Sequence, residues 1–481
     1  MSSKKTITKN YIYNLTYQIL ILILPLVTTP YISRILGAEN IGIYSYTVSI
    51  ATYFILFGSL GIALYGQRQI AYEQRKLKKL SKTFWEIIIL RFFTMTISML
   101  IFYFIFVKGE QYETYYKILL LELLANCFDI SWLFQGLEEF KKTVIRNIIV
   151  KLISVIAIFT FVKSVNDLEI YFLIYVLSNL IGNLSLWAYL PKYLKRVKLK
   201  QLNIIQHLKP TIGLFIPQIA IQVYTILDKT MIGAIIADKS EVGYYEQSQK
   251  IVKILLTVIT SLGTVMLPRI ANTFVSGDKA KVTSYMKKSF NMVFLLAFPM
   301  LFGVIAVSKS FVPVFFGQGY DKVTILMNII SPILLLIGLS NVTGTQYLLP
   351  TKRQKEYTIS VVCGAIINFL MNIGLIYKFG AVGASIGTVI AESTVTLIQM
   401  YTVRKDFKLK EIFQLARNYF LSSIIMFIIC LIIGKFIKNN LISIIIQVVI
   451  GGITYGSCLL ILKDNFIFEI FGRIKNKIRG N

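Results

Sequence analysis

About fourteen apolar segments follow one another along this chain, and each is long enough to cross a lipid bilayer. A helix needs about 20 apolar residues to cross a ~30 Å hydrocarbon core. The segments predict spans at 10–33, 41–66, 84–107, 114–136, 144–163, 168–190, 210–236, 244–270, 288–308, 323–349, 357–378, 381–403, 412–435 and 440–462. With 56% hydrophobic residues, the chain is too apolar for a soluble protein of 481 residues. We therefore predict an all-α, polytopic membrane protein.

The net charge of +28 does not indicate nucleic-acid binding, because the cations lie in short clusters between apolar spans. Alternate connections carry roughly 36 Lys and Arg residues, against roughly 10 in the other set. This bias predicts that both termini are cytoplasmic. The first apolar run is too long for a signal peptide and lacks a cleavage site, so we predict an uncleaved span in the cell membrane.

Two parts of the chain resemble each other. Residues 41–44 (IGIY) match residues 242–245 (VGYY), and at that offset Ser49 and Thr52 correspond to Lys250 and Lys253. Repeats of six spans each predict two pseudo-symmetric six-helix lobes around a central cavity. We predict a lobe at 1–200, a second lobe at 201–410, and two extra C-terminal helices with a basic cytoplasmic tail at 411–481.

A cationic stripe marks the eighth span. Glu246, Lys250 and Lys253 fall on one helical face, followed by threonines at the same spacing. Lysines inside a bilayer cost several kcal/mol unless they face water, a counter-charge or a ligand. The stripe therefore predicts a hydrophilic path for an anion, and Ser49 and Thr52 form its uncharged counterpart in the second span.

The seventh span carries a second polar face. Its glutamines and one lysine point the same way, with a neighbouring aspartate: Gln218, Gln222, Lys229 and Asp228. We predict that these residues line the outer half of the cavity. The alternative is that Asp228 and Lys229 lie at the outer interface and extend to water.

The first span ends near Arg34, which either extends to water or contacts an anion. Arginine is a bidentate ligand for phosphate, so Arg34 is a candidate anion contact. Pro25 and Pro217 occupy corresponding spans of the two repeats. Proline kinks a helix, so the pair predicts a hinge between inward and outward openings.

Several acids lie within predicted spans. Glu122 and Asp129 share a stripe in the fourth span, near Arg91 of the third. They form either a structural pair with Arg91 or a site that couples transport to an ion. Glu392, among hydroxyl groups, is a further candidate, as is Asp228. One carboxylate in such surroundings binds H⁺ or Na⁺, or accepts hydrogen bonds from its neighbours.

No motif indicates an enzyme. The sequence has no nucleophile elbow, no His cluster and no Walker motif, so we predict no catalytic residue, no metal site and no cofactor. The only histidine, His207, is expected to be a solvated loop residue rather than a proton relay. The four cysteines are expected to be small buried hydrophobic residues.

The sequences SRILGAENIGIYSYTVSI (33–50) and LDKTMIGAIIADKSEVGYYEQSQKI (227–251) resemble the polysaccharide-biosynthesis flippases of the Wzx type. These belong to a superfamily that includes multidrug-and-toxin exporters and the peptidoglycan lipid flippase. The resemblance implies alternating access that moves undecaprenyl-diphosphate-linked oligosaccharide from the inner to the outer leaflet for capsule, exopolysaccharide or O-antigen-like polymers. It implies substrate contacts at Arg34, Lys250 and Lys253, and a groove for the lipid tail in the last two spans.

The implied partners are the lipid-linked glycan, the bilayer, a polysaccharide polymerase and glycosyltransferases. We expect a monomer. Two other classes stay open at this stage. An ion-coupled multidrug exporter would favour an acid-lined cavity for organic cations, and a flippase could serve another polyprenyl-linked precursor, of peptidoglycan or teichoic acid. A scaffold without transport would leave the repeat and the charged stripe without a role.

Overall fold

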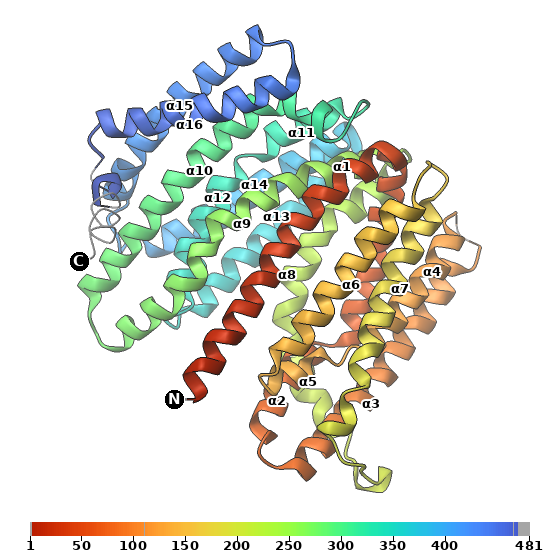
Figure 1. Cartoon of the computed structure of the whole chain (residues 1–481). Coiled ribbons are helices and arrows are strands. Elements are labelled where there is room, and N and C mark those ends of the chain that lie inside the picture. Colours follow the sequence, from red (N-terminus) through yellow and green to blue (C-terminus); the bar gives the residue numbers. More distant parts are fainter. Residues whose placement is uncertain (1, 110, 465, 470–481) are drawn as a thin grey trace. The chain divides into compact units, whose positions relative to one another are not determined.

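The computed structural model describes residues 2–109, 111–464 and 466–469, and every regular element in these ranges is a helix (Figure 1). Twelve helices of the described chain are long and apolar enough to cross a membrane. One of them, Leu20–Glu73, contains the second predicted span and the later part of the first, and the seventh predicted span forms a further helix, α8 (Leu208–Ile235). The prediction of an all-α, polytopic membrane protein is confirmed.

Helix α1 (Ser2–Ser59) holds the first two spans in one helical run, which is broken by non-helical backbone at Gly37. At Gly37 φ is 75° and ψ is 172°, a conformation that glycine adopts without a Cβ clash. The chain stays helical through Pro25. The run ends where Leu60 and Gly61 both take positive φ and turn the backbone into α2 (Ile62–Glu73).

The first compact unit comprises Met1–Gly233 and Asp238–Gly243. Besides α1, α2 and α8, it contains α3 (Leu77–Phe102), α4 (Glu113–Cys127), α5 (Ser131–Gly136), α6 (Phe140–Phe161) and α7 (Leu168–Trp187). Helix α4 packs against α7, α1 against α3, and α6 against α7. The fourth predicted span is interrupted between α4 and α5, around Asp129.

The second compact unit comprises Ala234–Ala237 and Tyr244–Asn481. Its helices are α9 (Ser240–Val275), which starts in the first unit, α10 (Lys279–Phe315), α11 (Asp321–Ile330), α12 (Ile333–Ser340), the π-helical segment η5 (Asn341–Leu348), α13 (Gln354–Phe379), α14 (Ala381–Val403), α15 (Leu409–Phe436) and α16 (Asn440–Ile461). Helix α13 packs against α14, and α10 packs against α15 and α16. The tenth predicted span breaks between α11 and α12 because Pro332 lacks the N–H that would continue the helix.

Helix α8 lies with the first unit, although the sequence repeat makes it the first helix of the second half. Near its start, the ring of Phe215 packs edge-on against Phe57 of α1 at 5.8 Å, and its backbone lies against Gly61. Near its end, Thr230 contacts Ser49 of α1. In the sequence, the boundary between the compact units therefore falls at residues 233–244, whereas the predicted lobe boundary lies at residue 200.

Several helices present apolar side chains outward. On α6, Ile149, Ile153 and Ile156 are exposed at helical spacing, and α13 and α16 carry similar rows. A large exposed apolar surface of this kind suits contact with lipid rather than with water. The outward faces of these helices therefore support the assignment of membrane spans.

The expectation of a solvated His207 is wrong, because this side chain is only 6% exposed. Its Nδ1 lies 2.7 Å from the hydroxyl of Tyr65 in α2, and its Nε2 lies 2.9 Å from a carboxylate oxygen of Glu86 in α3. Glu86 also accepts hydrogen bonds from the backbone N–H of Asn203 and the amide of Gln206. The connector before α8 is thus fastened to α2 and α3.

The expectation for the cysteines holds for two of them. Cys127 and Cys430 are buried, whereas Cys363 and Cys458 are half-buried. Cys363 lies on α13, a helix that keeps only one side packed against its neighbours, and Cys458 lies near the end of α16. Half-burial follows from these positions.

Candidate functional site

The polar stripe predicted in the second span lies on the second arm of α1 and meets α8. The hydroxyl of Ser49 donates to the carbonyl of Tyr46 and lies 2.9 Å from the hydroxyl of Thr230 on α8. Thr230 also donates to the hydroxyl of Tyr53 at 3.3 Å, and Thr52 donates to the carbonyl of Val48. These bonds satisfy polar groups that apolar surroundings would otherwise penalise.

On α8, Asp228 and Lys229 precede Thr230 and so lie beside this α1 contact. Asp228 is only 7% exposed, and Lys229 is half-buried. Gln222 is exposed one and a half turns earlier. The side chains of Pro217 and Gln218 lie outside the described residues.

Arg34 is exposed and lies on the first arm of α1, three residues before the break at Gly37. It belongs to the same compact unit as Ser49, Asp228 and Lys229. The first unit therefore carries two groups of predicted substrate contacts. Arg34, Ser49 and Thr52 lie on α1, and Gln222 and Lys229 lie on α8.

The two glycines that identify the sequence repeat contact each other. A Cβ on Gly42 would lie 1.7 Å from the carbonyl oxygen of Lys239, and a Cβ on Gly243 would lie 2.0 Å from that of Ala38. The contact is reciprocal, because Lys239 and Gly243 follow Ala38 and Gly42 at the repeat offset. Only glycine permits so close an approach of two backbones.

Lys239 reinforces this contact. Its ammonium group donates to the carbonyl of Gly233 at 2.7 Å and lies 5.1 Å from the ring centre of Tyr46. Burial lowers the pKa of Lys239 below its ordinary value, while the neighbouring Asp238 opposes that shift. No sequence pattern indicates this role for Lys239, because a cation in a short connection is typically solvated.

On α9, the predicted stripe lies on the more exposed side of the helix. Glu246 and Lys250 are half-buried and Lys253 is exposed, as are Thr257 and Thr264 farther along. The side chains between them, Gln247, Ser248, Gln249 and Val252, are buried. Helix α9 thus presents its cations away from the packed interior of its own unit.

A buried polar cluster beside the stripe was missed in the sequence. The hydroxyl of Tyr245 on α9 lies 3.1 Å from that of Thr388 on α14 and accepts a hydrogen bond from Gln249 at 2.7 Å. The signal was present, since residues 247–249 read Gln-Ser-Gln, three consecutive polar residues within a membrane span. Glu392 lies one turn beyond Thr388 on α14 and is buried, with Thr396 on the same helix.

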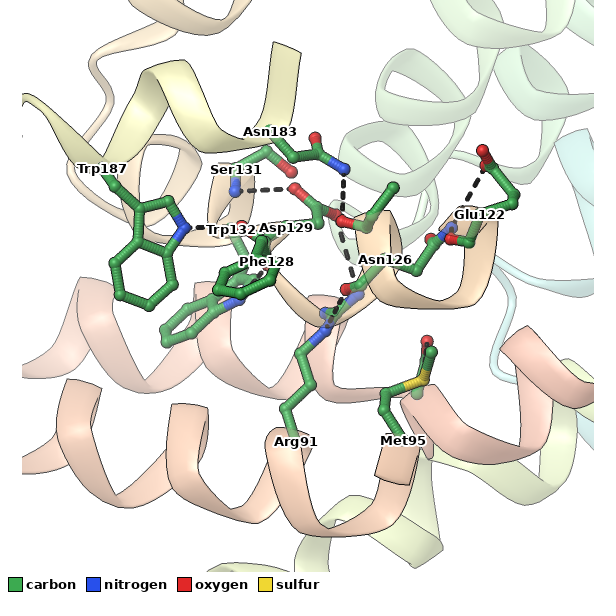
Figure 2. A network of polar contacts seen from close by, with 12 residues as sticks. Arg91, Met95, Glu122, Asn126, Phe128, Asp129, Ser131, Trp132, Asn183 and Trp187 are labelled. Atoms are coloured by element: carbon green, nitrogen blue, oxygen red, sulfur yellow. Dashed lines mark hydrogen bonds and ion pairs between the residues drawn. The ribbon is translucent and has the colours of Figure 1, made fainter. Parts of the chain in front are cut away.

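In the first unit, Arg91 of α3 is 2% exposed and points toward the C-terminal end of α4 (Figure 2). Its Nε donates to the carbonyl of Asn126 at 2.8 Å, and its Nη2 lies 3.9 Å from a carboxylate oxygen of Asp129. Asp129 also accepts from the backbone N–H of Ser131, the first residue of α5. Arg91 and Asp129 therefore stabilise the break between α4 and α5, where helix ends leave backbone groups unsatisfied.

Glu122 has different surroundings from Asp129. Its carboxylate accepts hydrogen bonds from Asn126, one turn along α4, and from Asn179 of α7 at 3.0 and 3.2 Å. Lys151 of α6 is close enough to act on it electrostatically. The carboxylate is thus buried at mid-span among two amides and one ammonium group. Asn179 and Lys151 were not singled out in the sequence, although a lysine in the middle of an apolar span was a usable signal.

Among the described residues, no group of three or more His, Cys, Asp or Glu side chains could hold a metal ion. The charged residues singled out above are spread over α1, α3, α4, α6, α8, α9 and α14. Charged side chains on apolar spanning helices mark pathways for ions or polar substrates. Together with the long apolar helices, they define a polytopic membrane transporter as the class of protein.

Comparison with solved structures supports this class at the level of the fold. The chain resembles "Lipid II flippase MurJ, inward closed conformation" with a TM-score of 0.72 and 16% identity, over 95% of this chain and all of that one. It also resembles an inward-facing "multidrug resistance MATE family transporter of the MOP superfamily", with a TM-score of 0.64 and 12% identity over 82% of this chain and 96% of that one.

Sequence comparison gives the family. The chain belongs to the polysaccharide biosynthesis protein family, whose model matches residues 7–274. It is 27% identical over 410 residues to a protein of Escherichia coli (strain K12) named "Putative O-antigen transporter", covering 84% of this chain and 98% of that protein. The resemblance predicted from residues 33–50 and 227–251 is confirmed.

Proposed function

We propose that this protein flips undecaprenyl-diphosphate-linked oligosaccharide from the inner to the outer leaflet, for assembly of a surface polysaccharide. The observation that carries the proposal is the pair Lys250 and Lys253 on the exposed side of a spanning helix. Each ammonium group at that depth costs several kcal/mol unless an anion or water compensates it. A diphosphate is the anion that a flippase of this family would bring there.

The residues proposed to contact substrate divide between the two compact units. Arg34, Ser49, Thr52, Gln222 and Lys229 belong to the first unit, with Gln218 on the same helix. Glu246, Lys250 and Lys253 belong to the second. We propose that α8 moves with the first unit during alternating access, since it is bound to α1 near both ends. Pro25, Pro217 and Gly37 are then the candidate bending points.

Sidedness is part of the proposal. The excess of Lys and Arg in alternate connections supports cytoplasmic termini, and we propose that the protein lies in the cell membrane. The diphosphate and glycan would enter from the cytoplasmic side, while the lipid tail stays in the bilayer. Helices α15 and α16, outside the sequence repeat, are the candidate groove for that tail.

We further propose that the transport cycle is coupled to H⁺ or Na⁺ through Glu122 or Glu392. Both are buried carboxylates at mid-span, and Glu122 accepts hydrogen bonds from two amides, with Lys151 and Tyr175 close enough to act on it electrostatically. Asp129, held by Arg91 and by the start of α5, is less suited to bind and release an ion. Asp228 remains a candidate of the first unit. We propose a monomer that acts with a polymerase and glycosyltransferases and needs no cofactor.

The double substitution Lys250→Ala with Lys253→Ala tests the function. We expect loss of surface polysaccharide while the protein still reaches the membrane, because a diphosphate would lose two cationic contacts. The matched control is Lys250→Arg with Lys253→Arg, which keeps both charges and should retain export. Normal export by the alanine variant would contradict the proposal.

An ion-coupled multidrug exporter is the second candidate, since the fold is shared with a multidrug transporter and buried acids are present. Such an exporter predicts altered drug resistance in a deletion strain with intact surface polysaccharide. The flippase predicts the reverse. The cations on α9 favour the flippase, because organic cations would be repelled there.

A further inference from the structure

A cavity of about 370 Å³ lies at the start of α10, and none of the residues assigned above lines it. Two adjacent ridges of α10 and the last described residues of the chain line it: Ala280, Thr283, Ser284, Lys287, Lys288, Asn291, Phe466 and Glu469. The lining therefore includes two lysines, two hydroxyl-bearing residues and one asparagine. These are the groups that bind a phosphate: charge from lysine, and hydrogen bonds from hydroxyl and amide.

The wall opposite α10 is held in place. Asp464 is buried and accepts from the hydroxyl of Tyr419 on α15 at 3.1 Å. The same oxygen accepts from the backbone N–H groups of Phe466 and Ile467, both at 3.2 Å. Asp464 therefore fixes the segment that carries Phe466 and Glu469 over the lysines.

Within the described part of the chain, each lysine contacts one carboxylate. Lys287 lies 2.8 Å from Glu411 of α15, and Lys288 lies 3.0 Å from Glu469. Ion pairs this exposed contribute little, about 0–1 kcal/mol. An ammonium group has three protons, so a phosphate can be added to such a pair or can replace the carboxylate.

Exposed apolar side chains lie close in sequence to Phe466 and Glu469 of the cavity. Ile461 and Leu462, at the end of α16, and Phe468 are exposed large hydrophobic side chains. A free phosphate would leave these apolar side chains exposed, whereas the acyl chains of a lipid would cover them. By the predicted sidedness, this end of α10 faces the cytoplasmic leaflet, where anionic lipids attract basic segments at about 1 kcal/mol per cation.

We propose that this cavity binds the phosphate headgroup of an anionic membrane lipid, with Lys287 and Lys288 holding the phosphate and Glu469 competing for Lys288. The acyl chains then lie along the end of α16. The cavity shares no lining residue with the proposed substrate contacts, and only its acyl chains would use α16 of the proposed tail groove, so its failure would leave the flippase proposal standing.

Native mass spectrometry of the purified full chain with phosphatidylglycerol tests the proposal, with phosphatidylcholine as the uncharged comparison. Lys287→Ala with Lys288→Ala should weaken phosphatidylglycerol binding at least tenfold. The control is Lys279→Ala with Lys281→Ala, which removes the same charge from exposed positions of the same helix outside the cavity and should bind as the native chain does. Unchanged binding by the cavity variant, or an equal loss in the control, would overturn the proposal.

Two further arms separate the alternatives. Glu469→Gln should bind phosphatidylglycerol more tightly, because the competing carboxylate is removed; weaker binding would overturn the role given to Glu469. This variant keeps the test informative even where the double alanine variant does not fold. Inorganic phosphate at millimolar concentration should not displace the lipid, and full displacement would show that the cavity takes free phosphate instead.

Discussion

Removing the side chain of His207 should destabilise the first compact unit alone. His207→Ala deletes the contact with Glu86 at 2.9 Å and the contact with Tyr65 at 2.7 Å. Both partners are buried, so water does not replace the lost bonds fully. The substitution weakens the attachment of the connector that leads into α8, although Glu86 keeps its hydrogen bonds to Asn203 and Gln206.

The magnitude follows from the two bonds. A hydrogen bond to a charged group contributes about 1.5–3 kcal/mol, and one between neutral groups about 0.5–1.5 kcal/mol. Together they give roughly 2–4 kcal/mol for His207→Ala. For a unit of this size, each kcal/mol lowers the melting temperature by about 2–4 °C, so we expect a fall of roughly 5–10 °C. Tyr65→Phe removes only the weaker bond and should cost about 1 kcal/mol.

Tryptophan fluorescence is a suitable assay, because Trp85, Trp132 and Trp187 all lie in the first unit and in or against the core that the connector covers. Thermal melting of the purified protein in detergent then reports on this unit. Lys209→Ala, an exposed substitution two residues away, is the control and should melt as the native chain does. The expected fall in melting temperature is several degrees. If His207→Ala melted within about 1 °C of the native chain, the contacts of His207 would not stabilise the first unit.

Three further experiments test the α1–α8 contact, the contact at Gly42 and the coupling role proposed for Glu122. The hydroxyls of Ser49 and Thr230 lie 2.9 Å apart, so the variant Ser49→Cys with Thr230→Cys can form a disulfide between α1 and α8. This disulfide should leave transport intact if α8 moves with the first unit. Reversible loss of transport on oxidation would contradict that movement. Gly42→Ala should lower the free energy of unfolding by roughly 1–3 kcal/mol, because its Cβ would force two backbones apart. Gly374→Ala is the control, because its Cβ would lie in open space. Equal melting temperatures of the two variants would refute the close contact at Gly42. Glu122→Gln should keep the fold but abolish transport driven by an ion gradient, and gradient-driven flipping in vesicles of this variant would exclude Glu122 as the coupling residue.

The spans could be predicted from sequence because each is a long apolar run whose length the bilayer dictates. The repeat could also be recognised from the sequence, because Gly42 and Gly243 occupy equivalent positions in two similar segments. The structure adds the physical reason for the motif: each glycine admits the other repeat's backbone carbonyl. The polar stripes of α1 and α9 were also visible, because helical spacing alone defines a face.

Other features depend on contacts that no local pattern contains. His207 looked solvated because its segment is polar, but its partners Tyr65 and Glu86 lie more than a hundred residues away in sequence. Helix α8 looked like part of the second half because the repeat begins there, whereas packing joins it to α1. The separate surroundings of Asp129 and Glu122 needed the positions of Arg91 and Asn179, which lie on other helices.

The most direct test of the central claim is flipping by the purified protein in liposomes. Undecaprenyl-diphosphate-linked oligosaccharide would be placed in one leaflet, and its arrival in the other would be followed with an enzyme or lectin that cannot cross the membrane. We expect the native chain to move the glycan, Lys250→Arg with Lys253→Arg to move it as well, and the double alanine variant to leave it in place. Equal rates in vesicles with native protein, with the alanine variant and with no protein would contradict the account.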